Sequence, residues 1–180
     1  RATASPASSQ RKPKSTACSC SCATRATQAA FTLAAGGLIA PSRVGITGQS
    51  HGGYAAAWGA TAQTAHFAAA VAAAPVTNLV SSHGTTDIPE ETVVNHYGVA
   101  PEEDWELYLN QSPVFHAAQS RTPTLIMHGE SDSRVNVSQI LVGIVGAGRR
   151  WPCGRASLWQ RSCRGDERLR AEYQCAQRGL

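Results

Sequence analysis

An α/β fold built on a parallel sheet is what the sequence predicts, because strand-like and helix-like segments alternate along its middle part. Residues 43–47 (RVGIT) read as a short strand. Residues 67–76 (FAAAVAAAPV) form a continuous run of small apolar residues closed by proline, which is typical of a strand buried on both faces, although alanine alone would equally allow a helix. Residues 122–129 (TPTLIMHG) give a third strand.

Helical segments are predicted between these strands. An alanine-rich segment follows the first strand and extends to about Gln63. A second helix is predicted to begin at Pro101, since proline suits the first turn and the acidic residues after it favour the positive end of the helix dipole. It should end before Pro113. Residues 77–100 are predicted to be an irregular polar stretch.

The turn after the first strand has the pattern G-x-S-x-G, in the segment Gly48-Gln49-Ser50-His51-Gly52. Glycines two before and two after the serine allow the strand and helix backbones to pass closely. Such a turn lifts Ser50 Oγ out of the sheet and directs the backbone amide of His51 toward an oxyanion. The motif alone also allows a glycine-rich turn with an ordinary serine.

Composition divides the chain into three parts. Residues 1–33 carry five Lys or Arg and no acidic residue, and they are rich in Ser, Thr and Ala without periodicity. We expect them to be disordered, with an organelle transit peptide as the alternative. Residues 34–140 carry three Arg against nine Asp or Glu and contain the α/β pattern. Residues 141–180 carry eight Arg against three acidic residues and show no consistent period.

The remaining composition excludes several classes of function. The formal charge of +4 comes from the two ends, which lack aromatic interleaving, so we expect no specific nucleic-acid partner. No apolar run is long enough for a bilayer, so we expect no membrane partner, and the cytoplasm is the favoured compartment. No cofactor is expected. We also expect no metal site or disulfide framework at the terminal cysteines, which lack C-x₂-C spacing and nearby histidine: Cys18, Cys20, Cys22, Cys153, Cys163 and Cys175.

Four segments together resemble a known family. GQSHGGY, AAVAAAPV, SPVFHA and TPTLIMHGESDSRV occur in an order and spacing similar to the catalytic domain of the prolyl oligopeptidase family of serine peptidases, in particular its acylaminoacyl-peptidase and dipeptidyl-peptidase branch. The likeness covers about residues 38–140. It implies part of an α/β-hydrolase fold and cleavage of short peptides.

The resemblance also implies roles for five residues. Ser50 matches the nucleophile, and Asp132, in HGESDSRV, matches the acid of the catalytic triad. His51 would donate its backbone amide to the oxyanion, and Val76 and Val135 would line the specificity pocket. Without this context, Asp132 would be read as a turn aspartate or a helix cap.

The general base has no candidate in the expected place. In this fold the chain order is Ser, then the acid, then His. All six histidines precede Asp132, namely His51, His66, His83, His96, His116 and His128. The segment before Ser50 that should supply a second oxyanion donor is likewise unlike the family. We hypothesise that both ends derive from a shifted reading frame; coding DNA whose alternative frames lack a family-like His-Gly segment would refute this.

The predicted function is therefore hydrolysis of short peptides through an acyl-enzyme on Ser50, impaired by the missing histidine. The expected partner is a peptide substrate. Three alternatives stay open: an esterase on the same fold, a non-catalytic fragment, and a nucleic-acid binder. Only the positive charge of the two ends supports the last of these. With about three core strands where the complete fold uses roughly eight, uncovered sheet surface should make the isolated chain poorly soluble.

Overall fold

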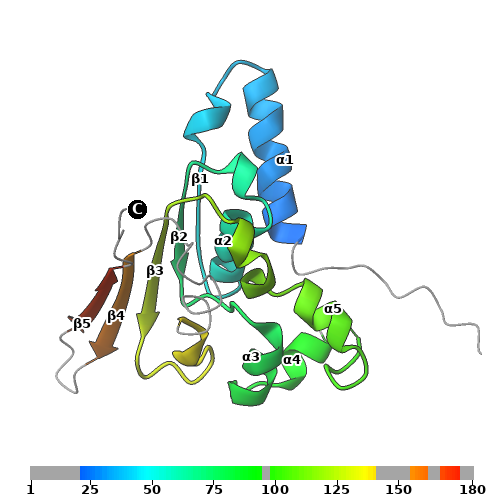
Figure 1. Cartoon of the computed structure of the whole chain (residues 1–180), viewed down its shortest axis with the longest axis vertical. Coiled ribbons are helices and arrows are strands. Elements are labelled where there is room, and N and C mark those ends of the chain that lie inside the picture. Colours follow the sequence, from blue (N-terminus) through cyan, green and yellow to red (C-terminus); the bar gives the residue numbers. More distant parts are fainter. Residues whose placement is uncertain (1–20, 95–97, 141–154, 162–166, 175–180) are drawn as a thin grey trace, which may run out of the picture.

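The structure, a computed structural model, describes residues 21–94, 98–140, 155–161 and 167–174 (Figure 1). Its sheet has the strand order β1-β2-β3-β4-β5. The first four strands pair in parallel, and β5 is antiparallel to β4. Their bounds are β1 Gly45–Gln49, β2 Ala69–Ala73, β3 Thr124–Gly129, β4 Arg155–Arg161 and β5 Glu167–Gln174.

Helices lie beside the sheet and below the carboxyl ends of β1, β2 and β3 (Figure 1). α2 packs on β1 and β2 and also contacts α1, whereas α3, α4 and α5 gather below. Ligand sites of open α/β sheets lie at the carboxyl ends of the strands. The helices are α1 Ser21–Ala35, α2 His51–Thr61, α3 Leu79–Thr85, α4 Glu90–Thr92 and α5 Trp105–Asn110, with 3₁₀ segments η1 Pro41–Arg43, η2 Thr64–His66 and η4 Pro113–Gln119.

The core between α2 and the sheet is made mostly of alanine. Small side chains on both surfaces allow the helix to lie close to the strands, and the alternate residues of β1 and β2 face it. The buried cluster comprises Ile46, Ala56, Ala57, Ala60, Phe67, Ala70 and Ala72. A second cluster of Tyr54, Leu79 and Tyr108 joins α2 to α3 and α5. This second cluster anchors the lower helices beneath the turn that carries Ser50.

The three predicted core strands are confirmed, and the alanine run is a strand rather than a helix. The second helix starts later than expected, at Trp105, because the Asp104 side chain accepts a hydrogen bond from Leu107 N at 3.1 Å and so caps the helix there. α3 lies in the stretch expected to be irregular. Its N-cap Asn78 accepts hydrogen bonds from the amides of Val80 and Ser81.

Both terminal segments contain more regular structure than their composition suggests. α1 includes residues 21–33, which we expected to be disordered, and Thr27 Oγ1 donates to Gln63 Oε1 at the end of α2, 2.8 Å away. β4 and β5 lie in the tail expected to lack a period, and β4 pairs with β3. Packing and strand pairing supply interactions that composition does not reveal. Residues 1–20, His96 and the cysteine side chains lie outside what the structure describes.

Within the described residues, no helix is both long and apolar enough to cross a bilayer.

Candidate active site

Ser50 lies at the sharp turn between β1 and α2. Its backbone adopts φ 55° and ψ −119°, a conformation that residues other than glycine rarely adopt. The Ser50 amide donates to Ala73 O at 3.0 Å, and Ser50 O accepts from Tyr54 N at 2.9 Å. Bonds to β2 and to the first turn of α2 thus hold the strained residue, and its side chain is exposed. Strain of this kind is concentrated at functional sites.

Two glycines around Ser50 make the turn possible. A Cβ on Gly48 would overlap the backbone of Gly52, and a Cβ on Gly53 would overlap Ala73 O. Around Gly52 itself, no atom lies within 4 Å of the place that a Cβ would occupy. The close approach expected between the motif glycines is therefore present, and it constrains the first one. Gly53 brings α2 against the end of β2, a role that the G-x-S-x-G pattern does not include.

His51 is the first residue of α2, so its backbone amide belongs to the first helical turn, where amides lack intrahelical acceptors. Its ring stacks on Tyr54 with centroids 5.7 Å apart and an interplanar angle of 27°. The imidazole thus lies along the surface of α2. The His51 amide therefore belongs to the turn after Ser50, whereas its imidazole packs on Tyr54.

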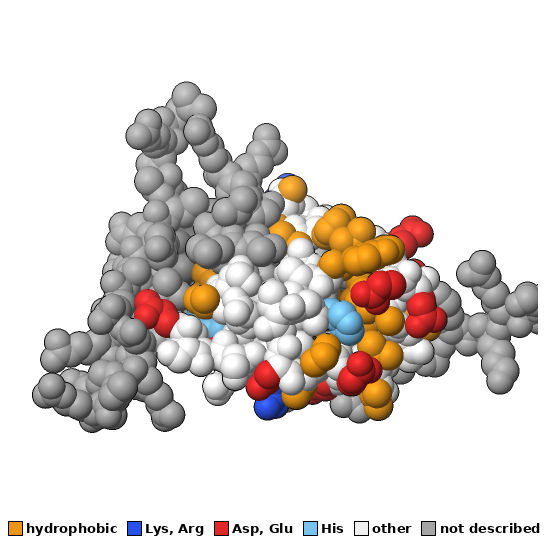
Figure 2. Space-filling view, turned by 90° about the horizontal axis from the view of Figure 1, so that it is seen from below, with side chains coloured by type: hydrophobic (Ala, Val, Ile, Leu, Met, Phe, Trp, Pro, Cys, Tyr) orange, Lys and Arg blue, Asp and Glu red, His pale blue; other side chains and the backbone are white. Residues whose placement is uncertain are grey.

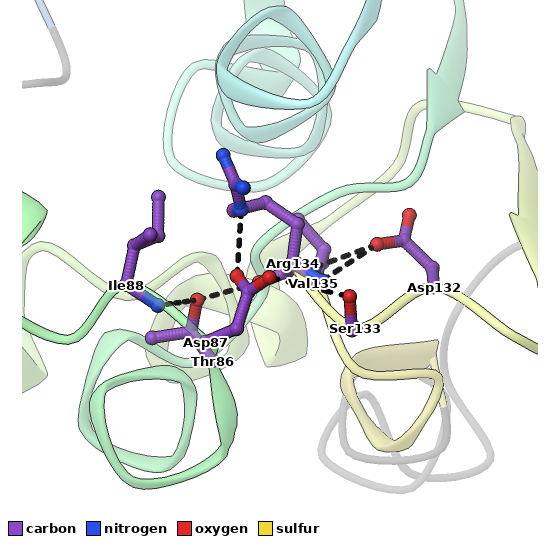
Figure 3. A network of polar contacts seen from close by, with 7 residues as sticks. All are labelled: Thr86, Asp87, Ile88, Asp132, Ser133, Arg134 and Val135. Carbon is purple, nitrogen blue, oxygen red and sulfur yellow. Dashed lines mark hydrogen bonds and ion pairs between the residues drawn. The ribbon is translucent and has the colours of Figure 1, made fainter.

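Asp132 lies in the turn after β3. Its Oδ1 accepts hydrogen bonds from the amides of Arg134 at 3.0 Å and Val135 at 2.9 Å, as in the turn aspartate that we considered as the alternative. The carboxylate is half-buried, and its second oxygen points away from these amides (Figure 3). These bonds fix the direction of the carboxyl group.

A pocket of about 70 Å³ brings four of the five predicted site residues together, and Asp132 is not among its lining residues. Ser50 and His51 form one side, Val76 comes from the segment after β2, and Val135 from the turn after β3. Val135 is only 5% exposed. The other lining residues, which sequence reasoning missed, are Tyr54, Leu79, Ser82, Thr86, Ile88, Glu91, Thr92 and Arg134.

A polar network joins the segment after α3 to the turn that carries Asp132 (Figure 3). Arg134 Nε donates to Asp87 Oδ1 at 2.6 Å, and Ser133 Oγ donates to Asp87 Oδ2 at 3.3 Å. Thr86 Oγ1 donates to Arg134 O at 2.7 Å. The hydrogen bond from Arg134 is the largest cause that lowers the pKa of Asp87, and desolvation opposes it. The network holds Arg134 at the pocket wall.

The described histidines other than His51 lie in separate environments. His128, on β3, is 3% exposed, and its Nδ1 lies 2.9 Å from Gly129 O. The ring of His116 packs edge-on against Trp58 with centroids 4.8 Å apart, and that of His66 packs edge-on against Phe31 at 5.0 Å. His83 lies on α3. Across the described part of the chain, no three His, Cys, Asp or Glu side chains are grouped as metal ligands would be.

Comparison with protein families identifies the family of the chain. The sequence profile described as the prolyl oligopeptidase family matches residues 23–143, well over half of the chain. The chain belongs to the prolyl oligopeptidase family. The match begins earlier than the likeness at residues 38–140 that the motifs indicated, so it includes most of α1. Family and fold together support serine peptidase chemistry by resemblance.

Individual members of the family are similar over the same region. The chain is 39% identical over 101 residues to the uncharacterized peptidase YuxL of Bacillus subtilis. The match covers 56% of this chain and 15% of that protein. It is 37% identical over 109 residues to the acylamino-acid-releasing enzyme of Arabidopsis thaliana. That match covers 57% of this chain and 14% of the enzyme. This prolyl oligopeptidase family chain thus matches about one seventh of the length of these relatives.

Solved structures of the family share the fold. A puromycin-hydrolyzing peptidase of Mycobacterium tuberculosis superposes with a TM-score of 0.69 at 26% identity, over 77% of this chain and 21% of that one. An acylaminoacyl peptidase in complex with Z-Gly-Gly-Phe-chloromethyl ketone superposes with a TM-score of 0.64 at 26% identity. The superposition covers 71% of this chain and 21% of that peptidase. The resemblance implied part of an α/β-hydrolase fold, and this partial fold is therefore confirmed.

Proposed function

We propose that this chain carries the nucleophile part of a serine peptidase site, with Ser50 as the nucleophile that attacks a peptide carbonyl. The observation that carries the proposal is the backbone of Ser50, a non-glycine residue at φ 55° between a strand end and a helix start. Two observations support the assignment: Ser50 is a strained, exposed residue at a pocket, and the chain belongs to a family of serine peptidases.

The other residues have roles in the same reaction. When Ser50 Oγ bonds to the carbonyl carbon, the carbonyl oxygen becomes an oxyanion, which the His51 amide stabilises by a hydrogen bond. Val76 and Val135 receive an apolar side chain of the substrate, since both line the pocket beside Ser50. Asp132 orients and stabilises the base that takes the Ser50 proton.

That base is the component that we propose to be missing from this chain. The sequence contains no histidine after Asp132, whereas the order of the triad in this fold places the histidine there. A serine hydroxyl without a base is a poor nucleophile. Loss of one triad member lowers kcat by about 10⁴–10⁶-fold. We therefore propose that the isolated chain turns over peptides very slowly, or acts as a non-catalytic fragment.

Labelling with a fluorophosphonate probe tests the nucleophile, with mass spectrometry to locate the modified residue. We expect slow labelling confined to Ser50. Ser50→Ala should abolish it, and Ser82→Ala, which removes another hydroxyl of the same pocket, should leave it unchanged. Labelling of other serines at an equal rate, or none at Ser50 at high probe concentration, would contradict the proposal.

A further inference from the structure

Ser50 and Ala74 are the two residues other than glycine that have a positive φ in the described part of the chain. Their φ values are 55° and 43°. Ser50 follows β1 and Ala74 follows β2, so the two residues lie at the same ends of neighbouring parallel strands. A Cβ makes this backbone conformation unfavourable, and it persists only where the surrounding structure enforces it. The strain at Ala74 therefore lies beside the strain at the proposed nucleophile.

One peptide group links Ala74 to the Ser50 turn and to β3. Its carbonyl, Ala73 O, accepts a hydrogen bond from Ser50 N at 3.0 Å, and its amide, Ala74 N, donates to Met127 O at 2.7 Å. The carbonyl and the amide belong to the same planar unit, so the two bonds fix its orientation. The φ angle of Ala74 is the first rotation after this unit. It therefore sets the direction in which the chain leaves β2.

The chain that leaves Ala74 forms part of the pocket. Pro75 is fully buried, and Val76 lines the pocket beside Ser50. The place that a Cβ on Gly53 would occupy lies 3.1 Å from Pro75 Cα, so the first turn of α2 passes close to this segment. Residues before proline prefer an extended backbone, which makes a positive φ at Ala74 still less favourable. The close packing at α2 and the position of Val76 both depend on the turn at Ala74.

The Ala74 side chain has little surface for contact with a ligand. It is 9% exposed, and it is not among the residues that line the Ser50 pocket. Seen from below, the molecule presents polar side chains and backbone at its centre, with hydrophobic and acidic side chains gathered mainly to one side (Figure 2). An effect of Ala74 on the site must therefore pass through the backbone.

We propose that Ala74 is a positioning residue for the Ser50 nucleophile. Its positive φ allows the peptide group between Ala73 and Ala74 to hold the Ser50 amide while the chain turns to place Val76 in the pocket. An extended Ala74 would carry the chain away from the pocket, or rotate that peptide group out of its hydrogen bond with Ser50. This inference rests on the proposed function for the role of Ser50. No bond to Ala74 forms or breaks in the reaction.

Two substitutions at Ala74 separate its backbone conformation from its side chain. Valine rarely adopts a positive φ, so Ala74→Val should disturb the turn, whereas glycine adopts this conformation freely. On the full chain we measure the rate of fluorophosphonate labelling at Ser50 and, by NMR, the hydrogen exchange of the Ser50 amide. Ala74→Val should slow labelling and speed exchange by about tenfold or more, as strain of this kind implies. Ala74→Gly should stay within about twofold of the parent in both.

Ala70→Gly is the matched control for Ala74→Gly. Ala70 lies near the start of the same strand and is similarly buried, but it has the regular strand conformation. Glycine increases the entropy of the unfolded chain at both positions, and relief of strain offsets this at Ala74 alone. Ala70→Gly should therefore lower the urea midpoint more than Ala74→Gly does. It should leave the labelling rate of Ser50 unchanged in the folded protein, because it does not alter the turn.

Several results would overturn the proposal. Parental labelling and parental exchange in Ala74→Val would show that the φ of Ala74 does not position Ser50. Equal changes in Ala74→Val and Ala74→Gly would assign the effect to the methyl group instead. If Ala74→Val does not fold, equal losses of stability in Ala74→Gly and Ala70→Gly decide against strain at Ala74. Exchange of the Ser50 amide needs no reactive hydroxyl, so it separates failure of this proposal from failure of the proposed function.

Discussion

Thr77 N donates a hydrogen bond to Gln139 Oε1, 3.1 Å away, although 62 residues separate the two in sequence. The Thr77 hydroxyl donates to Gln139 O, and the amide of Asn78 also donates to Gln139 Oε1 at 2.9 Å. Both Thr77 and Gln139 are fully buried. This pair joins the segment that follows Val76 to the segment that follows Val135, so it fixes the two valines of the pocket relative to each other.

Removal of the Gln139 side chain should destabilise the fold. Gln139→Ala leaves the buried amides of Thr77 and Asn78 without an acceptor, which costs about 1–3 kcal/mol in the free energy of unfolding. Urea denaturation of the variant and the parent measures this. Gln119→Ala, at an exposed glutamine of η4, is the matched control and should change stability little. Equal losses in the two variants would contradict the account.

Gly53→Ala should destabilise the protein although alanine favours helices. The added Cβ would overlap Ala73 O, so α2 must move away from β2. At Gly52, one position earlier in α2, a Cβ meets nothing within 4 Å, and alanine there should be neutral or stabilise by up to about 1 kcal/mol. Thermal unfolding of the two variants compares them directly. A stability gain in Gly53→Ala would show that the helix does not lie as close to the strand as described.

The stability that the ion pair between Asp87 and Arg134 contributes should depend on pH. Because the folded protein lowers the pKa of Asp87 below its ordinary value of 3.8, the ionised group contributes stability above that value, and the contribution is lost as the pH falls through the lowered folded-state pKa. The melting temperature of the parent should therefore exceed that of Asp87→Asn at neutral pH. The difference should vanish in strong acid. A difference that is the same at pH 3 and at pH 7 would contradict this.

The sequence predicted the turn and three of the five strands, because their signals are local, and it missed β4 and β5. Apolar runs mark β1, β2 and β3, and the glycines around Ser50 mark the turn. α3 was missed because Asn78 alone signals its start. α1 was missed because the stability of a Ser, Thr and Ala-rich helix depends on contacts with a distant partner, such as that between Thr27 and Gln63.

The pocket was predicted only in part for a similar reason. Val76, Val135 and Ser50 follow recognisable segments. Glu91, which lines the pocket, and Asp87, which pairs with Arg134, come from a polar stretch without a pattern. Arg134 lies within HGESDSRV and could have been singled out as the cation nearest to Asp132. Its partner Asp87 is 47 residues away, and nothing in the sequence indicates that pairing.

The central claim, a serine nucleophile without its base, is tested most directly by adding imidazole in solution to replace the missing histidine. We measure the rate of fluorophosphonate labelling at Ser50 against imidazole concentration at constant pH and ionic strength. A general base typically contributes about 10²–10⁴-fold, so partial replacement should raise the rate by about tenfold or more, in proportion to free imidazole. Labelling of Ser50 that is fast without imidazole and insensitive to it would contradict the claim.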